Sequence, residues 1–315
     1  MQARTLLQAI NYFSDEDRCI EFVRDQRWPD GNVTCPTCGR PDVSWLASRK
    51  VWQCKSRHAK RTFSVKVGTI FEDSPIPLSK WLPAVWLIAS AKNGISSYEL
   101  ARSVGVTQKS AWFMLHRIRL AMQGDNGLML GGTVEVDETF IGGKARFMHR
   151  SRASRAVNGR GAIGKTAVMG LLERHGPDGH STVRASVIPN VSKATLTAKV
   201  RRHVQKGSEV MSDAWRGYNG LEREYIRGVI DHAENYVDGK IHTNGIENFW
   251  TLLKRSIKGT YVSVEPFHLF RYVDEHAFRF NTRKATDADR MAHVIGGVTG
   301  LRLTYTALTG SDGVS

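Results

Sequence analysis

The apolar positions of the chain change their spacing twice, and each change marks a different kind of secondary structure. Residues 31–72 have few helical signals, many turn residues and short alternating runs such as VSWLA, KVWQC and RTFSVKV, which predict the strands of a small β unit. Residues 77–123 carry apolar residues at helical spacing instead. From about residue 128, strands come first and helices later. The chain is therefore predicted to be an α/β protein with several domains.

The middle region predicts two helices joined by a tight turn. SSYELARSV forms the first helix, Gly105 and Val106 follow it, and Thr107 is a good N-cap for the second helix, TQKSAWFMLHRIRLAM. A short helix, a turn that contains glycine and a second helix with a polar start form a helix-turn-helix. Its second helix would present Gln108 and Lys109 to base edges in the major groove of DNA. A plain helical hairpin is the alternative that the local sequence leaves open.

The last region has the element order of a layered α/β domain. TVEVDETFIG, KTAVMGLLER and STVRASVIP predict three strands, SKATLTAKVRRHV a helix, and SEVMSDAW and YIRGVI two further strands. Two amphipathic helices follow, TNGIENFWTLLKRSIKG and EPFHLFRYVDEHAFRFNTRK. This order predicts a ribonuclease H-like arrangement, a mixed five-stranded sheet with helices, in which the fourth strand lies beside the first. The segment after Lys284 carries no readable pattern.

Composition indicates a folded protein with a polyanionic partner. The 315 residues are 41% apolar and carry a formal charge of +15, and neutralising phosphates releases counterions, which draws a basic protein onto nucleic acid. Ribosomal or membrane-surface binding would also fit that charge. The longest apolar stretch, near LPAVWLIASA, is too short to span a bilayer, and the N-terminus lacks the pattern of a secretion signal. A cytoplasmic protein that does not enter the membrane is expected.

Two segments concentrate the basic charge. From Arg49 to Phe71 there are seven Lys or Arg residues and no acid, which favours contact with DNA over a merely solvated basic face. The glycine-rich stretch between the first two strands of the last region is also basic, and we interpret it as an arm that becomes ordered on nucleic acid. Its candidate DNA-binding residues are Arg146, Arg150, Arg152 and Arg155.

Three of the four cysteines lie within the first β region and have the spacing of a zinc site. Cys35-x2-Cys38 is followed by Cys54-x3-His58, and thiolates with an imidazole at such distances suit one tetrahedral, structural Zn²⁺. The region is therefore predicted to be a zinc ribbon. Cys35 and Cys38 as incidental small apolar residues are the alternative, and His58 departs from the repeated CxxC spacing of many ribbons. Cys19, outside this group, is expected to be a buried helix residue.

Three acidic residues stand where buried structure is predicted. Asp137 interrupts an apolar strand, with Glu138 expected on the opposite face, and Asp213 ends another strand that would lie beside the first. Glu247 opens a helix. Carboxylates are costly near a core unless something positive compensates them, and two Mg²⁺ ions about 3.5 to 4 Å apart would do so and would also catalyse phosphodiester chemistry.

Two of these acids have structural alternatives, and the helix around Glu247 helps to choose between them. Asp213 could instead cap the segment AWRGY, and Asn244-x-x-Glu247 matches a capping box. Lys254 lies seven residues after Glu247 on the same helix face, with Lys258 one turn further, so both lysines could contact a DNA phosphate next to a metal ligand.

Taken together, these motifs resemble the IS1595 (ISXO2-like) family of DDE insertion-sequence transposases. The resemblance runs from about residue 10 to 284 and is carried by CPTCGR with WQCKSRH and FSVKVGTIFEDSPIPLSKW, NGISSYELARSVGVTQKSAWFMLHRIR, VEVDETFIGGK, MSDAWRGY and HTNGIENFWTLLKRSIKGTY. The chain departs from many relatives at Arg57, where they place a fourth cysteine. Members of the broader group also replace the last acid by Asn or His, so the presence of Glu247 favours an active enzyme.

The resemblance implies a catalytic triad of Asp137, Asp213 and Glu247, with Lys254 as the basic residue that follows the family's glutamate by seven positions. It also implies two Mg²⁺ or Mn²⁺ ions per active site, one structural Zn²⁺, and a double-stranded DNA partner, comprising the terminal inverted repeats and the target. A homo-oligomer is expected when two DNA ends are paired. A DNA-binding regulator that no longer cleaves, and a structure-selective nuclease of the same fold, are the alternative functions.

The expected domain organisation follows from these assignments. It comprises an N-terminal helical segment, a zinc ribbon, a helix-turn-helix region, a ribonuclease H-like catalytic domain and a C-terminal tail, at residues 1–30, 31–72, 73–125, 126–285 and 286–315 respectively.

Overall fold

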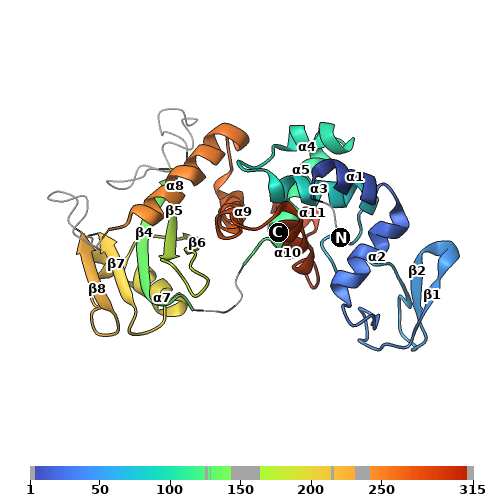
Figure 1. The fold of residues 1–315 in the computed structure, drawn as a ribbon, viewed down its shortest axis with the longest axis horizontal. Coiled ribbons are helices and arrows are strands. Elements are labelled where there is room, and N and C mark those ends of the chain that lie inside the picture. The colour runs from blue at the N-terminus through green and yellow to red at the C-terminus, as the bar shows by residue number, and fades with distance from the viewer. Residues whose placement is uncertain are drawn as a thin grey trace. The chain divides into compact units, whose positions relative to one another are not determined.

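A computed structural model describes residues 4–124, 127, 129–142, 164–213, 216–230 and 242–310 of the chain (Figure 1). Two compact units make up the molecule: Met1–Gln123 together with Lys284–Ser315, and Gly124–Arg283. None of the described helices is both long and apolar enough to cross a bilayer.

The first unit joins helices to a small antiparallel sheet with the strand order β1-β2-β3. Its strands are β1 (Val43–Leu46), β2 (Val51–Cys54) and β3 (Thr62–Phe63), and its helices are α1 (Leu6–Phe13), α2 (Glu16–Arg27), α3 (Leu78–Ser90), α4 (Ser97–Val104), α5 (Gln108–Ala121), α10 (Asp287–Gly296) and α11 (Tyr305–Thr309). Thr107 caps α5 by accepting a hydrogen bond from the Ser110 amide, as predicted. Gly105 ends α4 in the left-handed region, at a φ of +64°, which favours glycine.

The segment after Lys284 returns to this first unit. Its helix α10 packs against α3, and Thr299 forms an isolated antiparallel bridge with Thr69. Arg117 of α5 is buried and donates hydrogen bonds to the carbonyl oxygens of Leu303, Ile70 and Glu72. One guanidinium therefore joins α5, the segment before α3 and the C-terminal segment.

The second unit contains the predicted mixed sheet, with the order β6-β5-β4-β7-β8. Strands β4, β5 and β6 are antiparallel neighbours, and β4–β7 and β7–β8 are parallel pairs. The elements are β4 (Thr133–Ile141), β5 (Thr166–Glu173), β6 (Thr182–Ile188), α7 (Lys193–His203), β7 (Glu209–Asp213), β8 (Ile226–Ile230), α8 (Asn244–Ser256) and α9 (Leu269–Asn281). The expected strands and helices of this region, and the position of the fourth strand beside the first, are confirmed.

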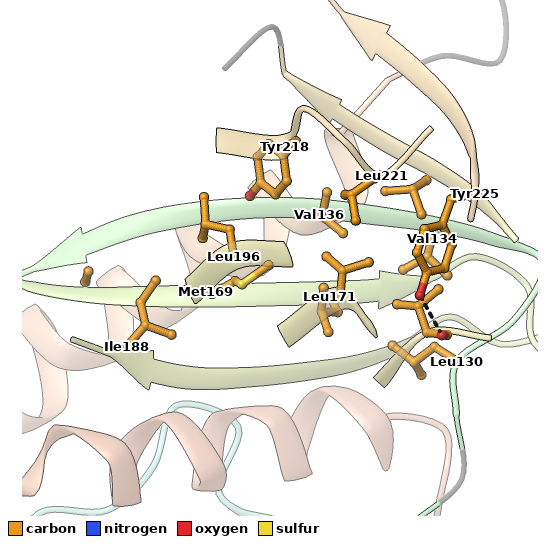
Figure 2. Packing of buried hydrophobic residues seen from close by; sticks show 14 residues of the cluster. Leu130, Val134, Val136, Met169, Leu171, Ile188, Leu196, Tyr218, Leu221 and Tyr225 are labelled. Carbon is orange, nitrogen blue, oxygen red and sulfur yellow. Dashed lines mark hydrogen bonds between the residues drawn. The ribbon is translucent and has the colours of Figure 1, made fainter. Parts of the chain in front are cut away.

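Alternating residues of the sheet serve two separate apolar clusters. Val134 and Val136 of β4 pack with α7 in the cluster of Figure 2, where the Tyr225 hydroxyl also donates to the Val204 carbonyl. On the other side, Ile141 of β4 packs with residues of α8 and α9. Because side chains alternate along a strand, Glu135 and Asp137 share the α8 side with Ile141. The alternation of β4 thus places Glu135 and Asp137 on the side of the sheet that α8 covers.

Candidate active site and metal centre

Helix α8 packs unusually close to the sheet at the level of Asp137. Gly170 of β5 pairs with Asp137 across the strands, and a Cβ at Gly170 would lie only 2.6 Å from Ile246 Cδ1 and from Trp250 Cζ2. The missing side chain therefore makes room for two large residues of α8. In this position the Trp250 indole Nε1 donates a 2.9 Å hydrogen bond to Asp137 Oδ2. Asp137 was predicted from the sequence but its hydrogen bond from Trp250 was not, because apolar periodicity marks Trp250 only as a buried residue.

The pKa of Asp137 responds to the charges of the other two predicted carboxylates. Burial raises the pKa of Asp137 to about 6, against hydrogen bonds from the Glu138 backbone and Trp250 that lower it. The charges of Asp213 and Glu247 raise that pKa further. Both carboxylates are therefore close enough to Asp137 to repel its charge. Carboxylate oxygens whose charges disfavour one another are groups that could hold a divalent cation.

Asp213 is the last residue of β7, the strand beside β4. The parallel register pairs Glu135 with Met211, so continuing that register by two residues brings Asp213 level with Asp137. The short 3₁₀ helix that follows begins at Arg216 and does not include Asp213. The position of Asp213 is thus a strand end, as the sequence predicted.

Glu247 lies in the first turn of α8, where the capping-box alternative proves wrong. The N-cap of this helix is Thr243, one residue earlier than that alternative requires, and the Thr243 side chain makes no capping hydrogen bond. Instead, the Thr243 hydroxyl donates a 2.8 Å hydrogen bond to Glu247 Oε1. The half-buried Glu247 carboxylate therefore accepts a hydrogen bond from the side chain of the N-cap residue.

The remainder of α8 follows its predicted pattern. Its buried side comprises Ile246, Phe249, Trp250, Leu253 and Ile257, while Lys254 and Lys258 are exposed. Lys258 belongs to a π-helical segment, Ile257–Tyr261, that follows the end of α8. Both lysines remain accessible to a partner.

Glu138 is a half-buried acid that lies near the predicted carboxylates Asp137 and Asp213 but was not among the predicted site residues. It lies on the opposite face of β4 from Asp137, as predicted, and accepts a hydrogen bond from the Tyr218 hydroxyl. Burial raises the pKa of Glu138 to about 7, the Tyr218 hydrogen bond lowers it, and the charges of Asp137 and Asp213 add to the increase. A carboxyl at this position can carry a proton near neutral pH.

The four predicted zinc ligands form a compact cluster in the first unit. The ligand atoms of Cys35, Cys38, Cys54 and His58 all lie within 4.8 Å of one another. Cys35 Sγ is 3.5 Å from His58 Nε2, and Cys38 Sγ is 3.7 Å from Cys54 Sγ. The other imidazole nitrogen, His58 Nδ1, lies 2.6 Å from the Ala59 carbonyl oxygen, which holds Nε2 toward the cysteines. Three thiols and one imidazole in this arrangement suit tetrahedral Zn²⁺.

The protonation of the cluster also suits a metal. Burial raises the pKa of the Cys54 thiol, but hydrogen bonds from His58, Ser56 and Cys38 bring it down to about 6. A thiolate is the form that binds zinc. Cys19 behaves differently: it is buried in α2, donates to the Phe13 carbonyl, and has its pKa raised by burial to about 12. This confirms the expectation that Cys19 is a core residue.

Among the described residues, no second group of three His, Cys, Asp or Glu side chains gathers its ligand atoms as closely as the Cys₃His cluster. The carboxylate oxygens of Asp137, Asp213 and Glu247 are thus less closely gathered than the four ligand atoms of that cluster.

The predicted DNA-reading residues have partners within the first unit. Gln108 Nε2 donates a 2.8 Å hydrogen bond to Ser97 Oγ of α4, which ties the two helices together. Lys109 is exposed, and its Nζ lies 4.8 Å from the centre of the Tyr305 ring, which belongs to α11. The candidate residues of the basic arm, Arg146, Arg150, Arg152 and Arg155, lie outside the described residues.

Comparisons with known proteins place these features in one family. A model of the ISXO2-like transposase domain matches residues 129–281, and a model of the transposase zinc-ribbon domain matches residues 14–58. An uncharacterized protein in transposable element ISH50 of Halobacterium salinarum is 29% identical over 265 residues, which cover 79% of this chain and 85% of that protein. An uncharacterized transposase-like protein of Haemophilus influenzae is 33% identical over 96 residues, which cover 30% of this chain and 77% of that protein.

The two family models include all three carboxylates and all four residues of the Cys₃His cluster, and both relatives are described in terms of transposition. The chain therefore belongs to the IS1595 (ISXO2-like) family of insertion-sequence transposases.

Proposed function

We propose that this transposase binds the terminal inverted repeats of an insertion sequence and catalyses metal-dependent DNA cleavage and strand transfer at Asp137, Asp213 and Glu247. The observation that carries the proposal is the position of the half-buried Asp137, which is held by Trp250 of α8, lies on the strand beside the one that Asp213 ends, and has its pKa raised by the charges of Asp213 and Glu247. Such an arrangement is costly without a cation and is suited to Mg²⁺ or Mn²⁺, which prefer oxygen ligands.

The sheet supports a ribonuclease H-like catalytic domain. Three antiparallel strands, β6, β5 and β4, are continued by the parallel strands β7 and β8, with α7 on one face and α8 and α9 on the other. In this topology the middle of β4 lies beside the end of β7, and α8, which packs on β4, carries the third acid, Glu247. Residues far apart in sequence can thereby share two metal ions.

The side chains of the site would divide the work among them. Asp137, Asp213 and Glu247 would hold two ions, and Trp250 would fix the rotation of the Asp137 carboxylate through its hydrogen bond. Lys254 and Lys258, exposed on and just after α8, would bind a DNA phosphate. Bound Mg²⁺ or Mn²⁺ would supply the chemistry by lowering the pKa of a water or a DNA 3′-hydroxyl and by stabilising the leaving oxygen.

The first unit would recognise the DNA. Its helices α4 and α5, joined at Gly105 and fixed to each other by Gln108 and Ser97, have the form of a helix-turn-helix, with Lys109 exposed on the second helix. The Cys₃His cluster would hold one structural Zn²⁺ in the adjacent ribbon. Pairing of two DNA ends would bring together two or more copies of the chain, and the charge of +15 supports a double-stranded DNA partner.

A deciding assay incubates the full-length, zinc-loaded protein with a duplex that carries the candidate terminal repeat, with and without Mg²⁺. We expect cleavage or joining that needs Mg²⁺ and is lost in Asp137→Ala and Asp213→Ala, while binding of the duplex persists. Specific binding without cleavage would favour a regulator that no longer cleaves. Cleavage that ignores the repeat sequence would favour a structure-selective nuclease, and activity that survives both substitutions would refute the assigned site.

A further inference from the structure

Glu135 is a second acid on the same face of β4 as Asp137, two residues before it, and only 1% of its surface is exposed. Its Oε1 accepts a 2.6 Å hydrogen bond from Arg174 Nε, and its Oε2 accepts a 2.8 Å hydrogen bond from the Ile246 backbone amide. A fully buried carboxylate is therefore shared between a cationic side chain and the first turn of α8.

These contacts satisfy a helix end that lacks a cap of its own. The first turn of a helix leaves amide groups without partners inside the helix, and the N-terminal end carries partial positive charge. The N-cap residue Thr243 makes no capping hydrogen bond with its side chain, and Glu135 supplies an acceptor from the sheet instead. Arg174 also donates to the carbonyl oxygen of His242 and lies 2.7 Å from its Nδ1, so the residue that precedes the helix N-cap is held as well.

The local sequence of α8 is adapted to this approach. A Cβ at Gly245 would lie 2.9 Å from Glu135 Oε2, 3.1 Å from Glu135 Oε1 and 3.1 Å from Leu172 Cδ2. Any larger residue at this position would push the first turn of α8 away from the carboxylate. Glu247 belongs to the same turn, directly after Ile246, and is tied to Thr243. The position of Glu247 relative to the sheet thus depends on contacts made by its neighbours in sequence.

We propose that Glu135, with Arg174, is a positioning residue of the active site: it fixes the first turn of α8 on β4 and so sets the distance between Glu247 and Asp137. This role rests on the proposed function, because it matters only if the two carboxylates share metal ions. Glu135 acts through the helix and does not itself hold a metal. Residues that orient metal ligands typically change metal affinity 10- to 100-fold when they are substituted.

The test measures metal binding without DNA. Free Mn²⁺ is followed by electron paramagnetic resonance in a titration of the zinc-loaded, full-length protein, and Asp137→Ala gives the background from other sites. In Glu135→Gln the amide oxygen still accepts from Ile246, but the negative charge that faces Arg174 is lost. We expect the apparent Mn²⁺ dissociation constant to rise about tenfold. The Mg²⁺ concentration needed for half-maximal cleavage should rise in parallel, with unchanged binding of the terminal repeat.

Two further variants separate positioning from general loss of stability. Glu275 is also fully buried and paired with an arginine, Arg279, but it lies on α9, so Glu275→Gln serves as the matched control for loss of a buried charge. Gly245→Ala tests the close approach of α8 to Glu135 by adding a Cβ between them. Gly296→Ala is its control, because a Cβ added at this helical glycine has nothing within 4 Å. We expect weaker Mn²⁺ binding in Gly245→Ala and wild-type binding in both controls.

Wild-type Mn²⁺ affinity in folded Glu135→Gln and Gly245→Ala would overturn the positioning role and leave the proposed function intact. The same would hold if Glu135→Gln lowered the melting temperature as Glu275→Gln does and left Mn²⁺ binding unchanged. A wild-type protein that binds no Mn²⁺ above the Asp137→Ala background would instead remove both the proposed metal site and the positioning role.

Discussion

Replacing Asp137 by asparagine should stabilise this protein when no Mg²⁺ is added, even though it should abolish catalysis. Asparagine has nearly the shape of aspartate and keeps an oxygen that can accept from Trp250 Nε1. It removes the negative charge, which burial and the neighbouring carboxylates disfavour. The substitution therefore isolates the loss of folding free energy that comes from holding an ionised acid at this position.

The size of the effect follows from the pKa of Asp137, which rises from 3.8 to about 6 in the folded protein. Because the folded pKa lies above the unfolded value, the folded state keeps its proton over a pH range in which the unfolded chain has lost it. The contribution of Asp137 to wild-type stability consequently falls as pH rises from about 4 to about 6 and then stays level. At pH 7.5 the loss amounts to at most about 3 kcal/mol.

The assay is urea unfolding of wild type and Asp137→Asn between pH 4.5 and 8, with zinc present and without added Mg²⁺. We expect the variant to be more stable by up to about 3 kcal/mol at pH 7.5, with a difference that shrinks as pH falls below about 6. Comparing the two proteins at each pH cancels the titration of groups that do not interact with Asp137, and the easier ionisation of Glu138 in the variant adds to its stability in the same direction. Asp178→Asn, at an exposed acid of the same unit, is the control and should change little. A variant that is less stable at pH 7.5, or a difference independent of pH, would refute the reasoning.

Three further predictions test other parts of the structure. His58→Ala should lower the zinc content, measured by elemental analysis, below one ion per chain. His180→Ala, at an exposed residue outside the ribbon, should retain the full zinc content. Full zinc in His58→Ala would contradict the role of His58 as a ligand. Gly170→Ala should destabilise the protein by about 1–3 kcal/mol in urea, since a Cβ would overlap Ile246 and Trp250, and an unchanged midpoint would contradict the close packing. Arg117→Met should lower the free energy of unfolding by at least about 3 kcal/mol, because three backbone carbonyls lose their donor. It should also speed proteolysis after Lys284, and an unaltered digest would contradict the anchoring of that segment.

Local signals were sufficient to predict much of the catalytic sheet. The strand β4 could be recognised because Val134 and Val136 alternate with polar residues, and the same alternation made the charge of Asp137 conspicuous. The N-cap of α5 at Thr107 depends on residues within four positions, so the sequence contains all the information needed to find it. The four residues of the Cys₃His cluster could be found from spacing alone.

Contacts between distant segments could not be found in this way. The anchor of the C-terminal segment is Arg117, whose partner Leu303 is 186 residues away and offers only a backbone carbonyl, which leaves no mark on the sequence. Glu135 was missed because a glutamate in an alternating strand ordinarily faces solvent, and its partner Arg174 lies on another part of the chain. At α8 the local signal was misleading: Asn244 and Glu247 have capping-box spacing, but the helix starts one residue earlier, after Thr243.

The three acids of β4 differ in the groups that compensate their charge. Glu135 is matched by the guanidinium of Arg174 and by a helix amide, and Glu138 by the Tyr218 hydroxyl together with a pKa that allows protonation near neutral pH. Asp137 has a neutral donor, Trp250, and within the described part of the chain no cationic side chain forms an ion pair with it, while two other carboxylates repel it. Since burial of an ionised acid requires compensation, Glu135 is the acid that the protein itself pairs with a cation, whereas for Asp137 we propose a divalent ion as the partner. The distinction rests on what each carboxylate contacts, because all three are acids of one alternating strand.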